Sequence, residues 1–344
     1  MSRIVYLFGA GASYGKRSPV DENFIFEGLP IVKEFPIQIN ALIARIKDKD
    51  TESNSRQKAT LEEKQSLLEL LDWLRKSCEK HDTVDTYAKK LWVTEKGQNY
   101  QKLKLALSAF ITLEQLFNKP DSRYDTFFAN ILGSSIGQLP KDVNILSWNY
   151  DCQFELAFSN YFDQKNLNSI WDFLNINGKT TSRRTNDENG FSIIKLNGTA
   201  ISFKEENLES SFHDPFFNRE VSEIAYVVRS QINNVNIKHQ NALSFAWEGT
   251  DPNFFSKIET KVNDAEILVV IGYSFPYFNR EVDRRIIRNM TNLQKVYIQD
   301  PNCEDVKESF EATLSDMQLY DLEEGKLKIV LKKSTQQFLI PNEM

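Results

Sequence analysis

The sequence predicts an α/β fold: a Rossmann-like parallel sheet with helices on both faces and a helical insertion. Short apolar runs of strand length recur along the chain, and long stretches with helical spacing of apolar residues separate them. Small or polar residues follow several of the runs. The first run, residues 4–8, passes directly into the turn Gly-Ala-Gly-Ala-Ser at 9–13, as at the start of a nucleotide-binding domain.

The run Ile-Leu-Val-Val-Ile at 267–271 is the most apolar and predicts a central parallel strand. The segment 201–256 shows no clear period, and we expect it to be irregular. The expected strands are 4–8, 143–146, 191–196, 267–271, 295–299 and 327–331, and the expected helices are 31–49, 61–79, 103–117 and 154–162.

The spacing of the first two strands predicts the domain organisation. The long helical stretch between them reads as an insertion, because the strand at 4–8 finds its next partner only at 143–146. No repeat, low-complexity tract or flexible linker divides the chain. We therefore expect a single domain, residues 1–344, with a core of 1–35 and 139–344 and a helical insertion at about 36–138.

Composition narrows the class of protein. With 344 residues, 41% of them hydrophobic and 26% charged, the chain can bury a sizeable core. The net charge of −6 argues against direct nucleic-acid binding. No apolar run is long enough for a membrane helix and no signal pattern opens the chain, so we expect a cytoplasmic protein. The three cysteines, Cys78, Cys152 and Cys303, lie far apart, which argues against a zinc ribbon and a disulfide framework.

The ends of the expected strands carry the candidate site. Ligands of open α/β sheets bind at the carboxyl ends of the strands. Gly9 and Gly11 leave room for a phosphate to approach backbone N–H groups. Asn149 and Asp151 have an alternative interpretation as a turn and a helix cap. The residues that follow the later strands are Asn149, Asp151, Asn197, Gly272, Ser274, Phe275, Gln299 and Asp300.

These motifs together resemble a known family. The Gly-Ala-Gly-Ala-Ser turn, the Asn-Tyr-Asp strand end, the Lys-Leu-Asn-Gly strand end and the Ile-Gly-Tyr-Ser-Phe strand end, in this order, resemble the sirtuin-type fold. The resemblance is specifically to the bacterial SIR2-like group associated with anti-phage defence, and it implies NAD as substrate or ligand.

The resemblance also implies a role for each motif residue. Asn149 would be catalytic, and Asp151 would lie on the nicotinamide side. Gln299 or Asp300 would lie near the adenine. The residues implied to contact the phosphates and the ribose are Gly9, Ala10, Gly11, Ala12, Ser13, Gly272, Ser274 and Phe275.

Two departures from the family pattern limit what the resemblance implies. The four zinc cysteines of sirtuin deacylases are missing, which argues against zinc and against protein deacetylation. The catalytic histidine of the family's Lys-Leu-His-Gly strand end is replaced by Asn197. An amide does not titrate near pH 7, and loss of a general base costs about 10²–10⁴-fold in rate. In this interpretation Asn149 holds a water molecule and Asn197 holds a ribose hydroxyl.

The chain offers other candidates to replace the missing histidine. Of the three histidines, His213 lies in the segment expected to pass over the site, so we count it among the candidate catalytic residues. We expect His81 and His239 at the surface. The resemblance also implies that the segment 83–87, with Asp85, approaches the site, although a helix start capped by Thr83 is the alternative.

The sequence thus leads to a functional hypothesis and two alternatives. The first is an NAD glycohydrolase of anti-phage defence that releases nicotinamide and is controlled by homo-oligomerisation or by a partner defence protein. The second is a catalytically silent NAD- or ADP-ribose-binding subunit, which the Asn197 replacement favours. The third, a nucleotide-binding scaffold with another hydrolase chemistry, has no visible metal cluster or nucleophile–base pair to support it.

Overall fold

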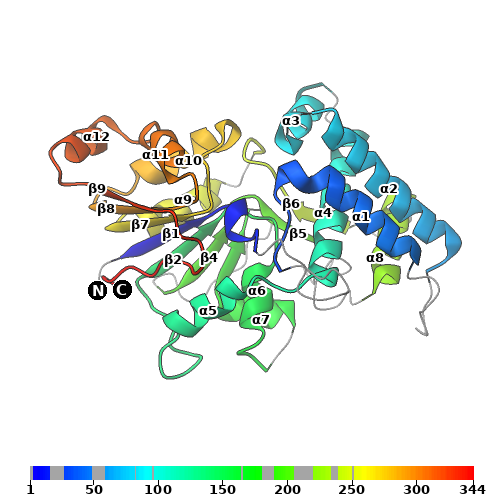
Figure 1. Ribbon diagram of the computed structural model, residues 1–344, viewed down its shortest axis with the longest axis horizontal. Helices are drawn as coiled ribbons and strands as arrows, with labels where there is room; N and C mark the ends of the chain where they lie inside the picture. Colours follow the sequence, from blue (N-terminus) through cyan, green and yellow to red (C-terminus); the bar gives the residue numbers. More distant parts are fainter. Residues whose placement is uncertain are drawn as a thin grey trace.

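The computed structural model describes residues 3–15, 27–48, 59–81, 83–94, 97–163, 166–179, 190–204, 220–233, 239–249 and 252–344. A seven-stranded, fully parallel sheet in the order β3-β4-β2-β1-β7-β8-β9 forms its centre (Figure 1). The predicted α/β class is confirmed, and the apolar run at 267–271 is a strand within the sheet. The strands are β1 (Ile4–Phe8), β2 (Val143–Ser147), β3 (Ile176–Gly178), β4 (Ser192–Lys195), β7 (Ile267–Ile271), β8 (Lys295–Gln299) and β9 (Lys328–Lys332).

Helices cover both faces of the sheet. Below the sheet in Figure 1 lie α5 (Ser122–Ile131), α6 (Gln153–Phe158) and α7 (Leu167–Phe173). Above it lie α9 (Pro252–Val262), α10 (Arg280–Arg288), α11 (Cys303–Glu311) and α12 (Asp316–Glu323). Successive side chains of a strand point to opposite faces, so β1, buried at every position, contributes to the cores on both sides.

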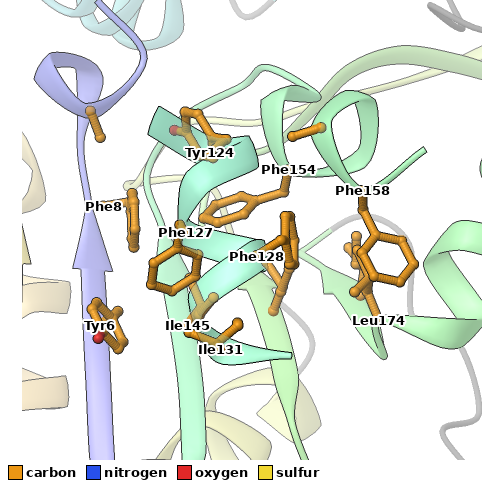
Figure 2. Packing of buried hydrophobic residues seen from close by; sticks show 14 of the residues in the cluster. Tyr6, Phe8, Tyr124, Phe127, Phe128, Ile131, Ile145, Phe154, Phe158 and Leu174 are labelled. Atoms are coloured by element: carbon orange, nitrogen blue, oxygen red, sulfur yellow. The ribbon is translucent and has the colours of Figure 1, made fainter. Parts of the chain in front are cut away.

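Aromatic rings fill the core below the carboxyl end of β1. Figure 2 shows Phe8 of β1 beside Tyr124 and Phe127 of α5 and Phe154 of α6. The ring centroid of Phe8 lies 5.0 Å from that of Phe154 and 5.2 Å from that of Phe338. Edge-to-face packing of this kind adds to the free energy of burial. It also fixes the last residue of β1, and with it the start of the glycine-rich turn.

A helical lobe lies beside the sheet, to the right in Figure 1. It contains α1 (Phe35–Asp48), α2 (Leu61–Glu79), α3 (Val84–Thr94), α4 (Gln98–Phe117) and α8 (Val221–Ile232). The two-stranded antiparallel sheet of β5 (Gly198–Lys204) and β6 (His239–Leu243) packs against it. α2 begins with a capping box of Thr60 and Glu63, and its buried face consists of Leu67, Leu70, Leu71, Leu74 and two serines.

The structure differs from the expected elements in several places, and α3, α7, α11 and α12 are among the helices absent from the expected set. The segment 201–256, expected to be irregular, contains most of β5, together with α8, β6 and the start of α9. Its two strands pair across residues far apart in sequence, so no local pattern marks them. The three-residue strand β3 is too short to give a periodic signal. The helix α5, within the expected insertion, packs below the sheet.

Among the described helices, none combines the length and the hydropathy that a membrane span requires.

Candidate nucleotide-binding site

The topology places a crevice next to β1. The chain passes from β1 to β2, its neighbour on one side, and later enters β7, its neighbour on the other side. The order of the strands therefore reverses at β1, which marks the switch point of the sheet. Parallel α/β sheets bind ligands at such a point, beyond the carboxyl ends of the strands. The turns after β1, β2, β7 and β8 all lie at this edge.

The glycine-rich turn packs against the backbone that follows β7. The N–H of Gly9 donates to the carbonyl of Ile271 at 3.0 Å, and that of Gly11 donates to the carbonyl of Gly272 at 2.9 Å. Gly272 has a positive φ of 58°, and a Cβ atom there would lie 2.3 Å from the backbone nitrogen of Ala12. The glycines are thus required by backbone packing alone, while exposed Ala10 forms the outer part of the turn.

A cavity of about 350 Å³ opens beside this turn. Four of the predicted site residues line it: Gly11, Gly272, Gln299 and Asp300. The remaining walls come from segments outside the predicted motifs. These additional lining residues include Tyr14, Gly15, Glu27, Asp121, Ser122, Arg123, Pro301, Thr335, Gln336 and Gln337.

Arg123 holds three walls of the cavity together. Its guanidinium donates to the carboxylate of Asp121 at 2.6 Å, to the carbonyl of Ala12 at 2.9 Å and to the carbonyl of Thr335 at 3.1 Å. Asp121 also caps α5 by accepting from the N–H of Arg123. Of the contacts of Arg123, only those of this cap are local enough to be recognised in the sequence. Its contacts with the glycine-rich turn and with Thr335 join residues far apart in the chain.

Gln299 forms hydrogen bonds to the C-terminal segment that lines the cavity. Its side-chain nitrogen donates to the carbonyls of Ser334 at 2.7 Å and Gln337 at 2.6 Å, and its oxygen accepts from the N–H of Leu339. Asp300 lines the cavity and accepts from the N–H of Asn302 at 2.8 Å. Gln299 therefore shapes the wall, whereas Asp300 brings a carboxylate to it.

The end of β2 is bonded directly to the glycine-rich turn. The side-chain nitrogen of Asn149 donates to the carbonyl of Gly9 at 2.9 Å and to Oγ of Ser13 at 3.0 Å. Ser13 in turn lies 2.8 Å from the hydroxyl of Tyr124. Asn149 is 7% exposed, so these contacts fix the orientation of its amide.

Asp151 is buried below the same network. Burial raises the pKa of its carboxyl above the usual range, although the charge of Lys195 and hydrogen bonds from Gln153 and Ser13 lower it. Lys195 is itself buried and pairs with Glu155 at 2.8 Å. Burial works against the charge of Lys195, but the nearby carboxylate of Glu155 raises its pKa above the ordinary value. This ion pair joins the end of β4 to α6, the helix after β2, and so supports the ends of these two strands.

Asn197 lies just after the end of β4. Its Nδ2 makes long contacts of 3.4 Å with the carbonyl of Trp148 and the hydroxyl of Tyr150. Its Oδ1 is buried and has no hydrogen-bond partner among the described residues. The same holds for Oγ of Ser244, whose N–H donates to the carbonyl of Asn197. An unpaired buried acceptor costs stability, so Oδ1 of Asn197 is suited to a ligand hydroxyl or a water molecule.

The helical lobe brings a carboxyl group to the strand ends. Asp85 lies in the first turn of α3, and burial raises its pKa to about 6. Its charge, together with burial, raises the pKa of Tyr150 and Tyr273, which follow β2 and β7. Thr83 caps the helix by accepting from the N–H of Thr86 at 3.0 Å, so the capping interpretation also holds.

Polar contacts join α4 to the segment that follows β6. Glu248, which follows β6, accepts from the hydroxyl of Tyr100 at 2.6 Å and pairs with Lys104 at 2.6 Å. Both partners lie on α4, and the pair is largely buried. The lobe that carries Asp85 is therefore joined to the segment after β6 by polar contacts as well as by apolar packing.

The remaining predicted residues lie at the edges of the site or outside it. Ser274 is exposed, and Phe275, with a positive φ of 52°, packs its ring against Tyr273 and Phe310. His213 lies outside the described residues. His81 stacks on a tyrosine within the helical lobe, and His239 begins β6. In the described segments, no group of three or more histidine, cysteine or acidic side chains is placed to hold a metal ion.

Comparisons with known proteins find only a distant likeness. No protein-family model matches the chain, and no curated protein matches it. Among solved structures, the structure of Sir2Tm bound to a propionylated peptide is similar over 95% of both chains, with 12% identity and a TM-score of 0.35.

Proposed function

We propose that the chain binds NAD at the carboxyl ends of β1, β7 and β8 and hydrolyses it to nicotinamide and ADP-ribose. The observation that carries this proposal is the cavity of about 350 Å³, which Gly11, Gly272 and Asp300 line at the switch point of the sheet. Its volume lies within the range of about 300–1,000 Å³ that is usual for small-molecule sites. Asn149 is bonded to Gly9, which belongs to the same turn as Gly11.

The proposed binding mode divides the dinucleotide between two regions. The adenosine half occupies the cavity, with the carboxylate of Asp300 accepting from a ribose hydroxyl. The pyrophosphate crosses the exposed turn at Ala10. The nicotinamide ribose then reaches the region of Asn149 and Asn197. Oδ1 of Asn197, which has no partner in the described part of the chain, accepts from one of its hydroxyls.

The proposed chemistry is hydrolysis of the bond between the ribose C1′ and the nicotinamide nitrogen. The bond breaks with its electron pair passing to nicotinamide, and a water oxygen bonds to C1′ while its proton passes to a base. Asn149, held by Gly9 and Ser13, positions the water. Asp85, with a pKa of about 6, is ionised at neutral pH and accepts the proton or balances the developing positive charge.

The motif resemblance adds a biological setting to this proposal. In that setting the chain is an effector of anti-phage defence that depletes NAD, and a partner protein or oligomerisation restrains it until infection. The direct test is the NAD content of infected cells that express either the wild-type chain or its Asn149→Ala variant. Depletion that requires both infection and Asn149 supports the role.

A second candidate function is a silent NAD- or ADP-ribose-binding subunit. The replacement of the family histidine by Asn197 favours it, because an amide cannot act as a base. The two candidates share the cavity and differ in whether the nicotinamide bond is broken.

Calorimetric titration with ADP-ribose tests the shared part. We expect binding by the wild-type chain and binding about tenfold or more weaker in Asp300→Ala, because a hydrogen bond to a charged group is lost. Asp264→Ala is the matched control, since Asp264 is an exposed partner of Arg3 at the opposite end of the sheet. Absence of binding, or equal weakening by both variants, would refute the proposed site.

A further inference from the structure

Asp283 of α10 is a buried carboxyl group that none of the predicted site motifs includes. It is 1% exposed. Its Oδ1 accepts from the indole N–H of Trp148 at 3.1 Å, and its Oδ2 accepts from the hydroxyl of Tyr273 at 2.7 Å. Each carboxylate oxygen therefore serves a different loop.

The two loops are those that carry the candidate site. Trp148 directly precedes Asn149 after β2, and Tyr273 directly follows Gly272 after β7. The rings of Trp148 and Tyr273 stack, with centroids 6.0 Å apart and planes at 16°. Because β1 lies between β2 and β7, the Asp283 carboxylate joins the loops on both sides of the switch point.

We propose that Asp283 is a positioning residue of the nucleotide site, whose carboxylate sets the spacing between the Asn149 loop and the Gly272 loop. The inference rests on the function proposed above. It adds that the affinity of the site for its nucleotide depends on a group that does not touch the nucleotide. Since a small displacement of positioning groups weakens a preorganised site, the effect on binding is measurable.

The protonation state of Asp283 decides whether both bonds form. Burial raises its pKa to about 7, although bonds from Tyr273 and Trp148 and the charge of Arg280 lower it. Both neighbours are donors to Asp283, so the ionised form, which only accepts, fits them best. The protonated form places a third donor hydrogen in the cluster. Asn279 donates to the Tyr273 hydroxyl at 3.1 Å, and Asp85 acts on Tyr273 from α3.

The link is tested first without any nucleotide. Spectra of the full chain labelled with ¹⁵N at its five tryptophans resolve the indole N–H groups, and Trp148→Phe identifies the signal of Trp148. We expect that signal to titrate near pH 7 in the wild-type chain and in Asp85→Asn, and not in Asp283→Asn. Glu281→Gln, which removes an exposed charge from the same helix, is the matched control and leaves the titration in place.

The consequence is tested by ADP-ribose affinity between pH 5.5 and 8.5. We expect the wild-type chain to bind about tenfold more weakly at the acid end, with Asp283→Asn weak at every pH and Glu281→Gln like wild type. An indole signal that titrates while the affinity of wild type and Asp283→Asn stays equal overturns the positioning role alone. Absence of ADP-ribose binding by the wild-type chain at every pH overturns the proposed function with it.

Discussion

The side-chain nitrogen of Asn149 donates to Oγ of Ser13 at 3.0 Å, and this bond joins the end of β2 to the glycine-rich turn after β1. Ser13 also contacts the hydroxyl of Tyr124 on α5. A strand end, a turn and a helix thus share one buried hydroxyl group. The amide that we propose to act on NAD is held in place before any ligand arrives, which is the arrangement that preorganised sites require.

Alanine substitutions at Gly272 and Gly325 distinguish the cost of close packing from the cost of a left-handed backbone conformation. Gly272 and Gly325 both have a positive φ, but only at Gly272 would the added Cβ meet backbone atoms. We expect Gly325→Ala to cost about 1 kcal/mol, the strain of a left-handed alanine. Gly272→Ala costs more, at about 3 kcal/mol or above, because the turn at Gly11 and Ala12 must also move. Denaturant unfolding of both variants measures the difference, and equal losses would contradict the packing account.

Removal of Lys195 leaves the carboxylate of Glu155 buried without its cation. We expect Lys195→Met to lower the free energy of unfolding by about 3–5 kcal/mol. The double variant Lys195→Met with Glu155→Gln recovers part of that loss, since the uncompensated charge is gone. Lys295→Met, which breaks the partly exposed pair with Glu343, costs much less. If both single variants lose the same amount by urea unfolding, the Lys195–Glu155 pair does not support the strand ends as described.

Oδ1 of Asn197, which has no partner among the described residues, predicts a small effect on stability and a large effect on activity. Asn197→Ala removes a buried acceptor that has no partner among the described residues, so we expect a stability change below about 1 kcal/mol. Nicotinamide release falls at least about tenfold, because a ribose contact is lost. The control is Asn177→Ala on β3, where Oδ1 is likewise buried and without a partner in the described part of the chain. Loss of release in both variants would assign the effect to folding rather than to the site.

The pKa of Asp85 predicts an acid limb in the pH profile of nicotinamide release. Release needs the carboxylate, so it falls as the pH drops through about 6. Asp85→Asn lowers the rate and removes this limb, while leaving in place the loss of nucleotide affinity near pH 7 that we propose for Asp283. A profile with an unchanged limb near 6 would exclude Asp85 from the reaction.

The same raised pKa has a consequence for stability. Burial raises the folded-state pKa of Asp85 above that of an ordinary aspartate, so folding favours its protonated form. Its burial cost is absent below about pH 4 and grows as the pH rises to about 6. Thermal unfolding should therefore show Asp85→Asn gaining stability over wild type between pH 4 and pH 8. A constant difference over this range would contradict burial of an ionisable Asp85.

Local sequence patterns were sufficient for much of the sheet and for part of the site. The strand at 267–271 and the turn at 9–13 could be predicted because their side-chain types follow from burial and from close backbone approach. Gly272 and Asp300 were selected because they follow strands. The structure places both at the cavity.

The rest depends on contacts between distant segments. Arg123 and Thr335 meet at the cavity across the length of the chain, and no local pattern relates them. Asp283 lies among charged residues of α10, a pattern typical of a surface helix, yet it faces inward to Trp148 and Tyr273. Pairing of β5 with β6 is likewise set by tertiary packing on α4 rather than by a turn.

The most direct test of the account is nicotinamide release from NAD by the purified full chain at high concentration, measured beside Asn149→Ala. We predict that the wild-type chain releases nicotinamide and ADP-ribose in equal amounts, and that Asn149→Ala is slower by about a hundredfold or more. ADP-ribose titration of both proteins shows whether the cavity is intact. ADP-ribose binding without release by the wild-type chain would contradict the hydrolase and leave the silent binding subunit, and neither binding nor release would contradict the nucleotide site itself.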